Sequence, residues 1–334
     1  MDLPISRRAA LRGLAASAAS AILAGCSTSE AMMPLPGKDL SGHAGQPRLV
    51  FASTRKATGD GTKNPWFGPE RGKQMTVGEL FFFARNNSFT GMIASTMNGT
   101  WNIDTVKPVT TDRPADVLPK LLEGKTPLLY THGYNETFES AATSLAQLAD
   151  GIGFSGQPIL FSWPSRGALL DYGYDRESAL WSRDAFEDCI TALCRDDSLP
   201  RVNLVAHSMG TLLTVETLRQ IRTRVGEAQD NRFGAIVLAA PDIDIDLFTN
   251  SLSRLGPLAE KITVIMASND RALELSQSLA GGVSRVGAAD RAALEKLGVK
   301  VVDATDFGSG LIRHSTFITN PDVRAVVKRA IERG

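Results

Sequence analysis

The fold of this 334-residue chain is decided by Val202-Asn203-Leu204-Val205-Ala206-His207-Ser208-Met209-Gly210. The mainly apolar residues 202–205 predict a buried strand, and a short turn with small residues around Ser208 follows at once. From residue 211 to residue 224, apolar side chains recur at the spacing of an amphipathic helix. A strand, a tight turn and a helix in this order lift a serine hydroxyl above the edge of a sheet, at the positive end of a helix.

Outward from this stretch, apolar strands alternate with amphipathic helices from Pro127 onward. The predicted strands are 127–131, 158–163, 201–206, 234–240, 262–267 and 300–302. Because crossover helices cover the faces of such a sheet, the alternation predicts an α/β fold with a mostly parallel central sheet and helices on both faces. Ligands of these sheets bind beyond the carboxyl ends of the strands, so polar residues at those ends are the candidates for chemistry.

The opening section has a different pattern. Residues 48–54, 79–84 and 91–96 are short β-like runs separated by turn-forming residues, which predicts an antiparallel N-terminal section. The chain is 43% hydrophobic and 22% charged, an ordinary globular composition, and residues 47–334 suit a single domain. The 36 basic residues balance 36 acidic residues, which argues against nucleic acid as a partner.

Residues 1–25 predict an export signal. Arg7, Arg8 and Arg12 precede an uncharged run of Gly, Ala, Ser, Leu and Ile that is too short to span a bilayer. Leu23-Ala24-Gly25-Cys26 is similar to the lipobox of bacterial lipoproteins, which predicts acylation of Cys26; the alternative is a simple signal that ends near a cysteine. The arginine pair also resembles the twin-arginine motif, so two export routes stay open.

Residues 26–46 are rich in Ser, Pro, Gly and Met and predict a tether between the lipid and the first strand. Ser27, where an aspartate would signal retention, resembles the pattern for sorting to the outer membrane. We therefore expect an exported protein, held by its lipid on a membrane that faces the periplasm. Loss of residues 1–25 removes three arginines and one aspartate and leaves a net charge of −2.

The other two cysteines lie in one predicted helix. Cys189 and Cys194 are five residues apart and point about 140° away from each other, because each residue turns a helix by about 100°. This spacing predicts buried free thiols and no disulfide. No cluster of cysteines and histidines has the spacing of metal ligands, so no metal site is predicted.

Histidine positions select the base for Ser208. On sheets that carry this turn, the order along the chain is serine, then acid, then histidine. Of the four histidines, only His314 follows Ser208, in a loop after the last predicted strand. His314 is therefore the candidate base, against the alternative of a surface histidine.

Two aspartates at strand ends are candidates for the acid that orients the imidazole. Asp270 follows the strand 262–267, where most folds of this kind carry their acid, and we favour it. Asp242 follows the strand 234–240 and is the alternative acid; it could instead cap a helix or order the loop.

Two backbone N–H groups are needed to bind the oxyanion of a tetrahedral intermediate. The first is that of Met209, directly after the serine. The second is expected from Tyr134, in the turn that follows the strand 127–131. His132 in this turn has either a functional or a purely bracing role, and Asn135 is predicted to cap the next helix.

A further aromatic segment follows the strand 158–163. Trp163 and the residues around Tyr172 could wall an acyl or leaving-group pocket. The simpler interpretation, which we favour, places Trp163 in the core and lets Asp175 cap a helix that begins near Arg176.

In combination, these motifs resemble a bacterial family of uncharacterised, esterase-like α/β-hydrolases, often described as lipoproteins. The resemblance runs from about residue 48 to residue 320 and is carried by 51–55, 68–72, 132–135, 162–165, 174–178, 206–210, 240–244 and 269–273. It implies an α/β-hydrolase fold that includes the opening strands, and it leaves the substrate open.

The expected function is hydrolysis of carboxylic esters by Ser208, His314 and Asp270, with a small molecule or a lipid as the acyl donor and without a cofactor. The same triad would also serve an acyltransferase, a thioesterase or an amidase. A periplasmic binding or scaffold lipoprotein that has kept the fold without turnover is the alternative from another class.

Overall fold

The structure is a computed structural model, and it describes most of the chain from Pro47 onward. The described residues are 47–58, 64–84, 101–167, 171–267, 270, 273, 276–278, 282, 284–305, 307 and 320–334. None of the helices in these ranges is long and apolar enough to cross a membrane.

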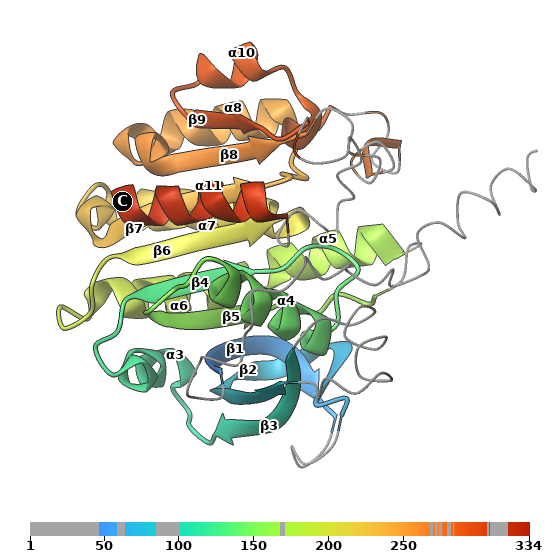
Figure 1. The fold of residues 1–334 in the computed structure, drawn as a ribbon, viewed down its shortest axis with the longest axis vertical. Coiled ribbons are helices and arrows are strands. Elements are labelled where there is room, and N and C mark those ends of the chain that lie inside the picture. The colour runs from blue at the N-terminus through green and yellow to red at the C-terminus, as the bar shows by residue number, and fades with distance from the viewer. Residues whose placement is uncertain are drawn as a thin grey trace, which may run out of the picture.

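A nine-stranded sheet in the order β3-β2-β1-β5-β4-β6-β7-β8-β9 runs through the described part of the chain (Figure 1). Its strands are β1 (Arg48–Ala57), β2 (Phe67–Ala84), β3 (Trp101–Val109), β4 (Pro127–Thr131), β5 (Gln157–Ser162), β6 (Val202–His207), β7 (Phe233–Ala239), β8 (Ile262–Met266) and β9 (Lys300–Asp303). In sheet order from β1 to β9, all neighbouring strands pair in parallel. The strands β2 and β3 pair antiparallel and extend the sheet beyond β1. The predicted fold class, an α/β-hydrolase fold with an antiparallel N-terminal section, is confirmed.

Helices cover both faces of the sheet. They are α3 (Pro114–Val117), α4 (Phe138–Gly151), α5 (Tyr172–Trp181), α6 (Arg183–Arg195), α7 (Met209–Val225), α8 (Ile245–Leu255), α10 (Arg291–Glu295) and α11 (Pro321–Arg333), with a 3-10 helix, η2 (Leu118–Leu122), before β4. One apolar core joins the sheet to α6, α7 and α8, and a second joins the other face to α4 and α11. Neighbouring residues of each central strand enter opposite cores, as when Leu128 faces α4 while Leu129 faces α6, because side chains alternate along a strand.

The opening strands differ from the sequence prediction. β2 begins at Phe67, well before the predicted start at residue 79. The sequence pattern does not reveal its first half, because that half is largely exposed and lacks an apolar alternation. β3 was missed: it is an edge strand with few buried positions and a proline at residue 108, which an edge strand tolerates. The strand predicted at 91–96 lies outside the described residues.

The interior helices bear out the prediction for the cysteines. Cys189 and Cys194 are buried free thiols on α6. Burial raises the pKa of Cys189 and raises that of Cys194 to about 12, so both are neutral at physiological pH.

Candidate active site

Ser208 lies between the end of β6 and the first residue of α7, as predicted. Its backbone angles are φ 49° and ψ −123°, in a region that favours glycine, and only 2% of the residue is exposed. Its N–H donates to the carbonyl of Ala239 on β7 at 3.0 Å, and its carbonyl accepts from the N–H of Thr211 at 2.9 Å. The neighbouring strand and the helix thus hold the serine in an unfavourable conformation.

Strained backbone conformations occur together at the carboxyl ends of the central strands. Positive φ angles occur at four described residues other than glycine, and three of these follow β4, β6 or β7: Asn135, Ser208 and Ala240. The fourth, Glu123, ends η2. Unfavourable backbone conformations that cluster in one place are typical of functional sites.

The turn after β4 packs directly on the serine. Thr131 pairs with Ala206 in the parallel register, so the residues that follow these two strands are neighbours. A Cβ added at Gly133 would lie 2.9 Å from the Cβ of Ser208, which shows how closely this turn approaches. Tyr134, the candidate second oxyanion donor, comes next along the chain.

Met209, the other candidate donor, is the first residue of α7. N–H groups of a first helical turn have no acceptor within the helix and point toward its positive end. Gly210 lets α7 start against the turn, since a Cβ there would lie 2.5 Å from the carbonyl oxygen of His132 and 2.8 Å from that of Thr131. The helix therefore begins within van der Waals contact of the β4 turn.

His132 has the bracing role that the sequence left open as one alternative. Its ring is fully buried and stacks on Trp163, with ring centroids 4.7 Å apart. Nδ1 lies 2.8 Å from the carbonyl oxygen of Gly133, and Nε2 lies 3.1 Å from that of Trp163. Burial, assisted by the charge of Arg55, holds the pKa of His132 well below its usual range, so the ring is neutral at pH 7.

The two candidate acids have different surroundings. Asp270 is fully buried beyond the end of β8, and its Oδ1 accepts from the N–H of Leu273 at 3.3 Å. Asp242, beyond the end of β7, forms an ion pair of 3.2 Å with the buried Arg285. Its carboxylate also accepts from Tyr172 Oη at 3.1 and 3.2 Å and from Ser276 Oγ at 2.8 Å. Asp242 thus belongs to a buried network that joins α5 to the loop after β8.

Two helix-cap predictions were wrong. Asn135 does not cap α4; it has a φ of 61°, and Thr137 caps the helix through a capping box with Ser140. Asp175 does not cap α5 either, because that helix begins at Tyr172 and Asp175 lies fully buried in its first turn. Trp163 is core, as predicted.

His314 and Cys26 lie outside the described residues, so their surroundings are not part of this geometry. Among the residues that are described, no group of three or more His, Cys, Asp or Glu is placed to hold a metal ion. Sequence reasoning gave no role to Arg55 or Arg285, although Arg55 lies in one of the stretches that carry the family resemblance. Buried arginines lack a local pattern, and contacts across the sheet define their role.

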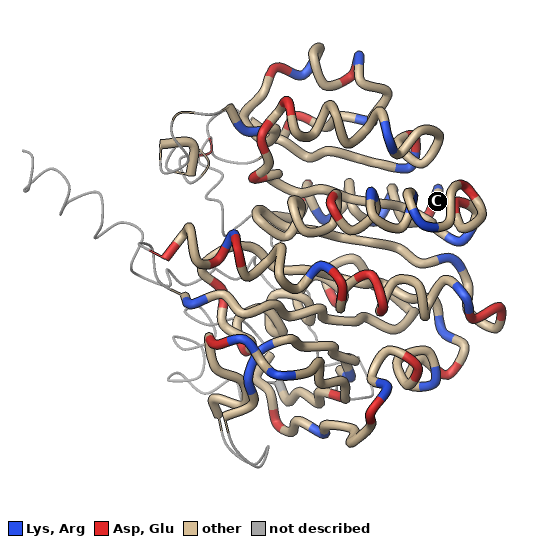
Figure 2. The backbone as a smooth tube through the Cα atoms, turned by 180° about the vertical axis from the view of Figure 1, so that it is seen from behind, with Lys and Arg blue, Asp and Glu red and all other residues tan. Residues whose placement is uncertain are grey.

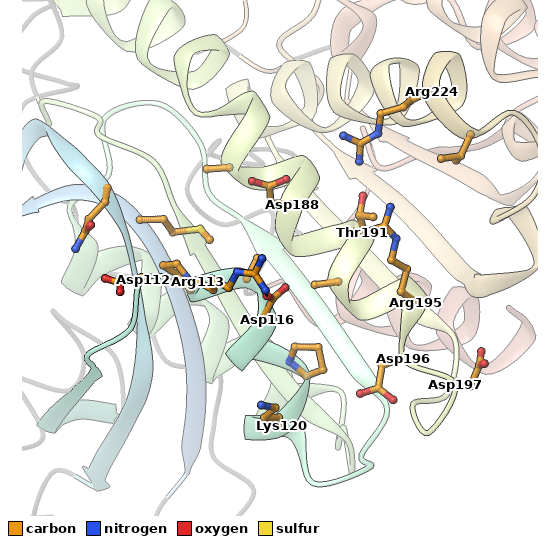
Figure 3. Close-up of a pocket in the computed structure, with 18 residues that line it drawn as sticks. Asp112, Arg113, Asp116, Lys120, Asp188, Thr191, Arg195, Asp196, Asp197 and Arg224 are labelled. Carbon is orange, nitrogen blue, oxygen red and sulfur yellow. The ribbon is translucent and has the colours of Figure 1, made fainter.

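A cleft of about 1190 Å³ lies elsewhere, between β2, α3 and α6 (Figure 3). The 18 residues that line it include no candidate site residue, and its charged side chains have both signs: Asp112, Arg113, Asp116, Lys120, Asp188, Arg195, Asp196, Asp197 and Arg224. The cleft is therefore separate from the serine site.

The sheet order, the turn at Ser208 and the two strand-end aspartates define an α/β hydrolase. The chain belongs to a family described as α/β hydrolases of unknown function (DUF900), whose model matches residues 116–331.

Individual relatives are distant. The chain is 31% identical to an uncharacterized protein of Nostoc sp. (strain PCC 7120), alr1448, over 119 residues, which are 28% of this chain and 31% of that protein. Among solved structures, a predicted CIB-like hydrolase from Thermoplasma acidophilum is 15% identical, covers 77% of this chain and 99% of its own, and has a TM-score of 0.37. A hyperthermophilic esterase from Pyrobaculum calidifontis is 15% identical over 77% of this chain and 80% of its own, with a TM-score of 0.33. Similarities at this level support no inference about activity.

Proposed function

We propose that this protein is a serine hydrolase that cleaves carboxylic esters, with Ser208 as the nucleophile. The observation that carries the proposal is the conformation of Ser208 between β6 and α7, with φ 49° and ψ −123°. Such a turn presents a serine side chain at the carboxyl ends of the strands, where ligands of these sheets bind. A purely structural serine gains nothing from a costly conformation at this position.

In the proposed reaction, Ser208 Oγ attacks the acyl carbonyl and passes its proton to His314. The N–H groups of Met209 and Tyr134 bind the oxyanion, and the alcohol leaves with the proton from His314. Water then hydrolyses the acyl-enzyme by the same steps in reverse order. This chemistry requires no cofactor.

We infer that Asp270 orients His314. Asp242 is the weaker candidate, because Arg285, Tyr172 and Ser276 already engage its carboxylate. An orienting acid must accept from the imidazole, and the donors already around Asp242, one of them a cation, compete with that bond.

Fluorophosphonate labelling of the purified protein tests the nucleophile. We expect a covalent adduct on the wild type and none on Ser208→Ala. An unlabelled wild type would instead support the non-catalytic alternative, a binding or scaffold protein. An acyl-donor panel of esters, thioesters and amides on the unlabelled wild type then separates hydrolysis of esters from the related reactions of the same triad.

Paired substitutions test the acid. We expect Asp270→Asn to lower kcat by about 10⁴-fold, as loss of the imidazole-orienting acid does in other serine hydrolases. Asp242→Asn should instead lower the free energy of unfolding by about 3 kcal/mol, because it leaves the buried Arg285 unpaired. Ester turnover and urea unfolding of both variants measure the two effects, and the opposite pattern would make Asp242 the acid.

We also propose, from the sequence pattern, that the protein is exported and acylated at Cys26. The lipid would keep it on a membrane that faces the periplasm, within reach of acyl lipids as well as small esters. Cell fractionation tests this: Cys26→Ser should move the protein from the membrane to the soluble fraction. Retention of that variant in the membrane would contradict a lipid anchor.

A further inference from the structure

We propose that Arg55 and Asp175 form a pair of positioning residues, the turn clamp, that holds the turn 132–136 against Ser208. The turn carries Tyr134, so this inference rests on the proposed function, in which the N–H of Tyr134 binds the oxyanion. Both residues act through the turn and not on the substrate.

Arg55 reaches the turn from β1, although β5 lies between β1 and β4 in the sheet. Its Nε donates to Ser162 Oγ at 2.9 Å, and its Nη1 donates to the carbonyl of Ser165 at 2.9 Å. Its Nη2 donates to the carbonyl of Glu136 at 2.6 Å. A longer bond of 3.4 Å joins Nη1 to the carbonyl of Gly68. One buried guanidinium therefore ties the end of β5 and the loop after it to the turn after β4.

Asp175 holds the same two segments from α5. Its Oδ2 accepts from the hydroxyl of Ser165 and, at 3.4 Å, from the N–H of Asn135. Its Oδ1 accepts from the N–H of Arg166 at 2.8 Å. Ser165 Oγ accepts in turn from the N–H of Glu136 at 3.2 Å. The loop after β5 is thus a bridge between the clamp and the turn.

The clamp fixes the peptide groups that follow Tyr134, and His132 fixes the one before it. The carbonyl of Gly133 lies 2.8 Å from Nδ1 of His132. After Tyr134, the N–H of Asn135 and both polar backbone groups of Glu136 contact clamp residues or Ser165. Asn135 also has a φ of 61°, a conformation that needs support from its surroundings. Tyr134 is therefore held on both sides by buried side chains.

Burial works against both charges of the clamp. Only 2% of Arg55 is exposed and Asp175 is fully buried. Desolvation lowers the pKa of Arg55 to about 10 and raises that of Asp175. Apolar residues of similar size are often as stabilising as buried charges, so the pair is better explained by the geometry that it imposes than by stability. That geometry lies in the turn beside Ser208 and in the loop after β5 that braces this turn.

Kinetics of three variants test the clamp: Arg55→Met, Asp175→Asn and the smaller change Ser165→Ala, each made in the full chain. We expect Arg55→Met and Asp175→Asn to lower kcat by about 10²-fold with KM unchanged within twofold, because a shift of about 1 Å in a reacting group costs about that factor. Ser165→Ala removes one hydroxyl and is expected to fold, and it should also lower kcat. A short-chain nitrophenyl ester is the substrate.

A trifluoromethyl ketone gives a readout that a merely structural role would not change. It forms an anionic hemiketal with a serine nucleophile, so its inhibition constant reports the oxyanion donors. We expect this constant to rise by the same factor as kcat falls. The matched control is Arg232→Met. Arg232 also donates to three backbone carbonyls, those of Cys194, Asp196 and Leu199. It lies before β7, at the amino ends of the strands and away from Ser208. Its kcat and inhibition constant should match the wild type.

The two clamp residues should also be non-additive. If both act through one turn, the double variant Arg55→Met with Asp175→Asn loses little more kcat than the stronger single variant. Losses that multiply would show two independent effects and overturn the pair.

The outcomes separate this inference from the proposed function. A wild type that is labelled at Ser208, with clamp variants whose kcat and inhibition constant stay within twofold, overturns the clamp alone. Should Arg55→Met fail to fold, Ser165→Ala and Asp175→Asn still decide by the same measurements. A wild type without Ser208-dependent labelling overturns the proposed function, and the clamp with it.

Discussion

Ser208 combines a costly conformation with firm support from its neighbours. A residue other than glycine at φ 49° and ψ −123° costs about 1–3 kcal/mol. The bonds from Ser208 to Ala239 and from Thr211 to Ser208 compensate for this cost and keep the turn in one shape. Strain of this kind is relieved when a glycine replaces the side chain.

The strain predicts that two substitutions at Ser208 differ in their effect on stability. Ser208→Gly should raise the free energy of unfolding by about 1 kcal/mol relative to Ser208→Ala, because glycine accepts the conformation and alanine does not. Both variants lack the hydroxyl, so neither should be labelled by a fluorophosphonate. Urea unfolding of the two variants measures the difference, and equal midpoints would argue against strain at this residue.

The buried imidazole of His132 should make the protein less stable at mildly acidic pH. Its pKa in the folded protein is held well below the ordinary value of about 6.5, by burial first and then by the charge of Arg55. Below pH 6.5 the unfolded chain therefore binds a proton that the folded protein does not. The contribution of His132 to stability is complete above this pH and is lost as the pH falls toward the folded-state pKa.

Urea unfolding from pH 8 to pH 5 measures this effect. We expect the free energy of unfolding of His132→Gln to depend less steeply on pH below 6.5 than that of the wild type, by at most about 1.4 kcal/mol per pH unit. Carboxylates contribute equally to both proteins, so the difference isolates the imidazole. Parallel curves would show that folding leaves the pKa of His132 unchanged.

Among the elements, α7 depends on its close approach to the turn after β4. A Cβ at Gly210 would lie 2.5 Å from the carbonyl oxygen of His132, and backbone atoms at that distance cannot move aside cheaply. The glycine two residues after the serine is therefore required for packing between α7 and the turn after β4. Gly210 is close to Ser208 in the sequence, but the backbone that it approaches, at the end of β4, is distant in the sequence.

Gly210→Ala should lower the free energy of unfolding by about 1–3 kcal/mol and reduce turnover, because it displaces the turn that faces Ser208. Gly173→Ala is the matched control: a Cβ at Gly173, the second residue of α5, would meet nothing within 4 Å. Alanine there should not lower stability, because glycine is the poorer helix former. Thermal unfolding of both variants gives the comparison, and a neutral Gly210→Ala would contradict the tight packing.

In the molecule as a whole, the two buried cysteines report on global unfolding. Both side chains of α6 enter the core between the sheet and the helices, and neither is appreciably ionised at neutral pH. In a form of the protein that begins at Ser27, a disulfide reagent should modify Cys189 and Cys194 only as fast as the protein unfolds. Circular dichroism measures that unfolding rate independently, and faster modification would mean that α6 detaches locally.

Charge is also distributed at the scale of the whole molecule. Figure 2 shows acidic and basic residues interspersed along the described chain, without a large region of one sign. This agrees with the balance of 36 basic and 36 acidic residues. For the proposed function, this balance leaves recognition of substrate to the local groups around Ser208 and not to a long-range field.

The sequence by itself determined the features that short-range sterics control. A strand, a small-residue turn and a helix around Ser208, and the alternation of strands and helices from β4 to β9, follow from local patterns of residue size and hydrophobicity. They were sufficient for the fold class and for the position of the candidate nucleophile. The exposed first half of β2 and the edge strand β3 lack such a pattern, so their bounds came only from pairing with β1 and with each other.

Only the tertiary structure decided how distant residues combine. Arg55 and Asp175 are 120 positions apart, and they act on one turn because β1, β5 and β4 lie side by side and α5 brings Asp175 within hydrogen-bond distance of the turn after β4. Asp242 and its partner Arg285 are also brought together by the fold, because Asp242 precedes β8 in the chain and Arg285 follows it. A buried charge has a role only through its partners, and chain folding alone brings those partners together.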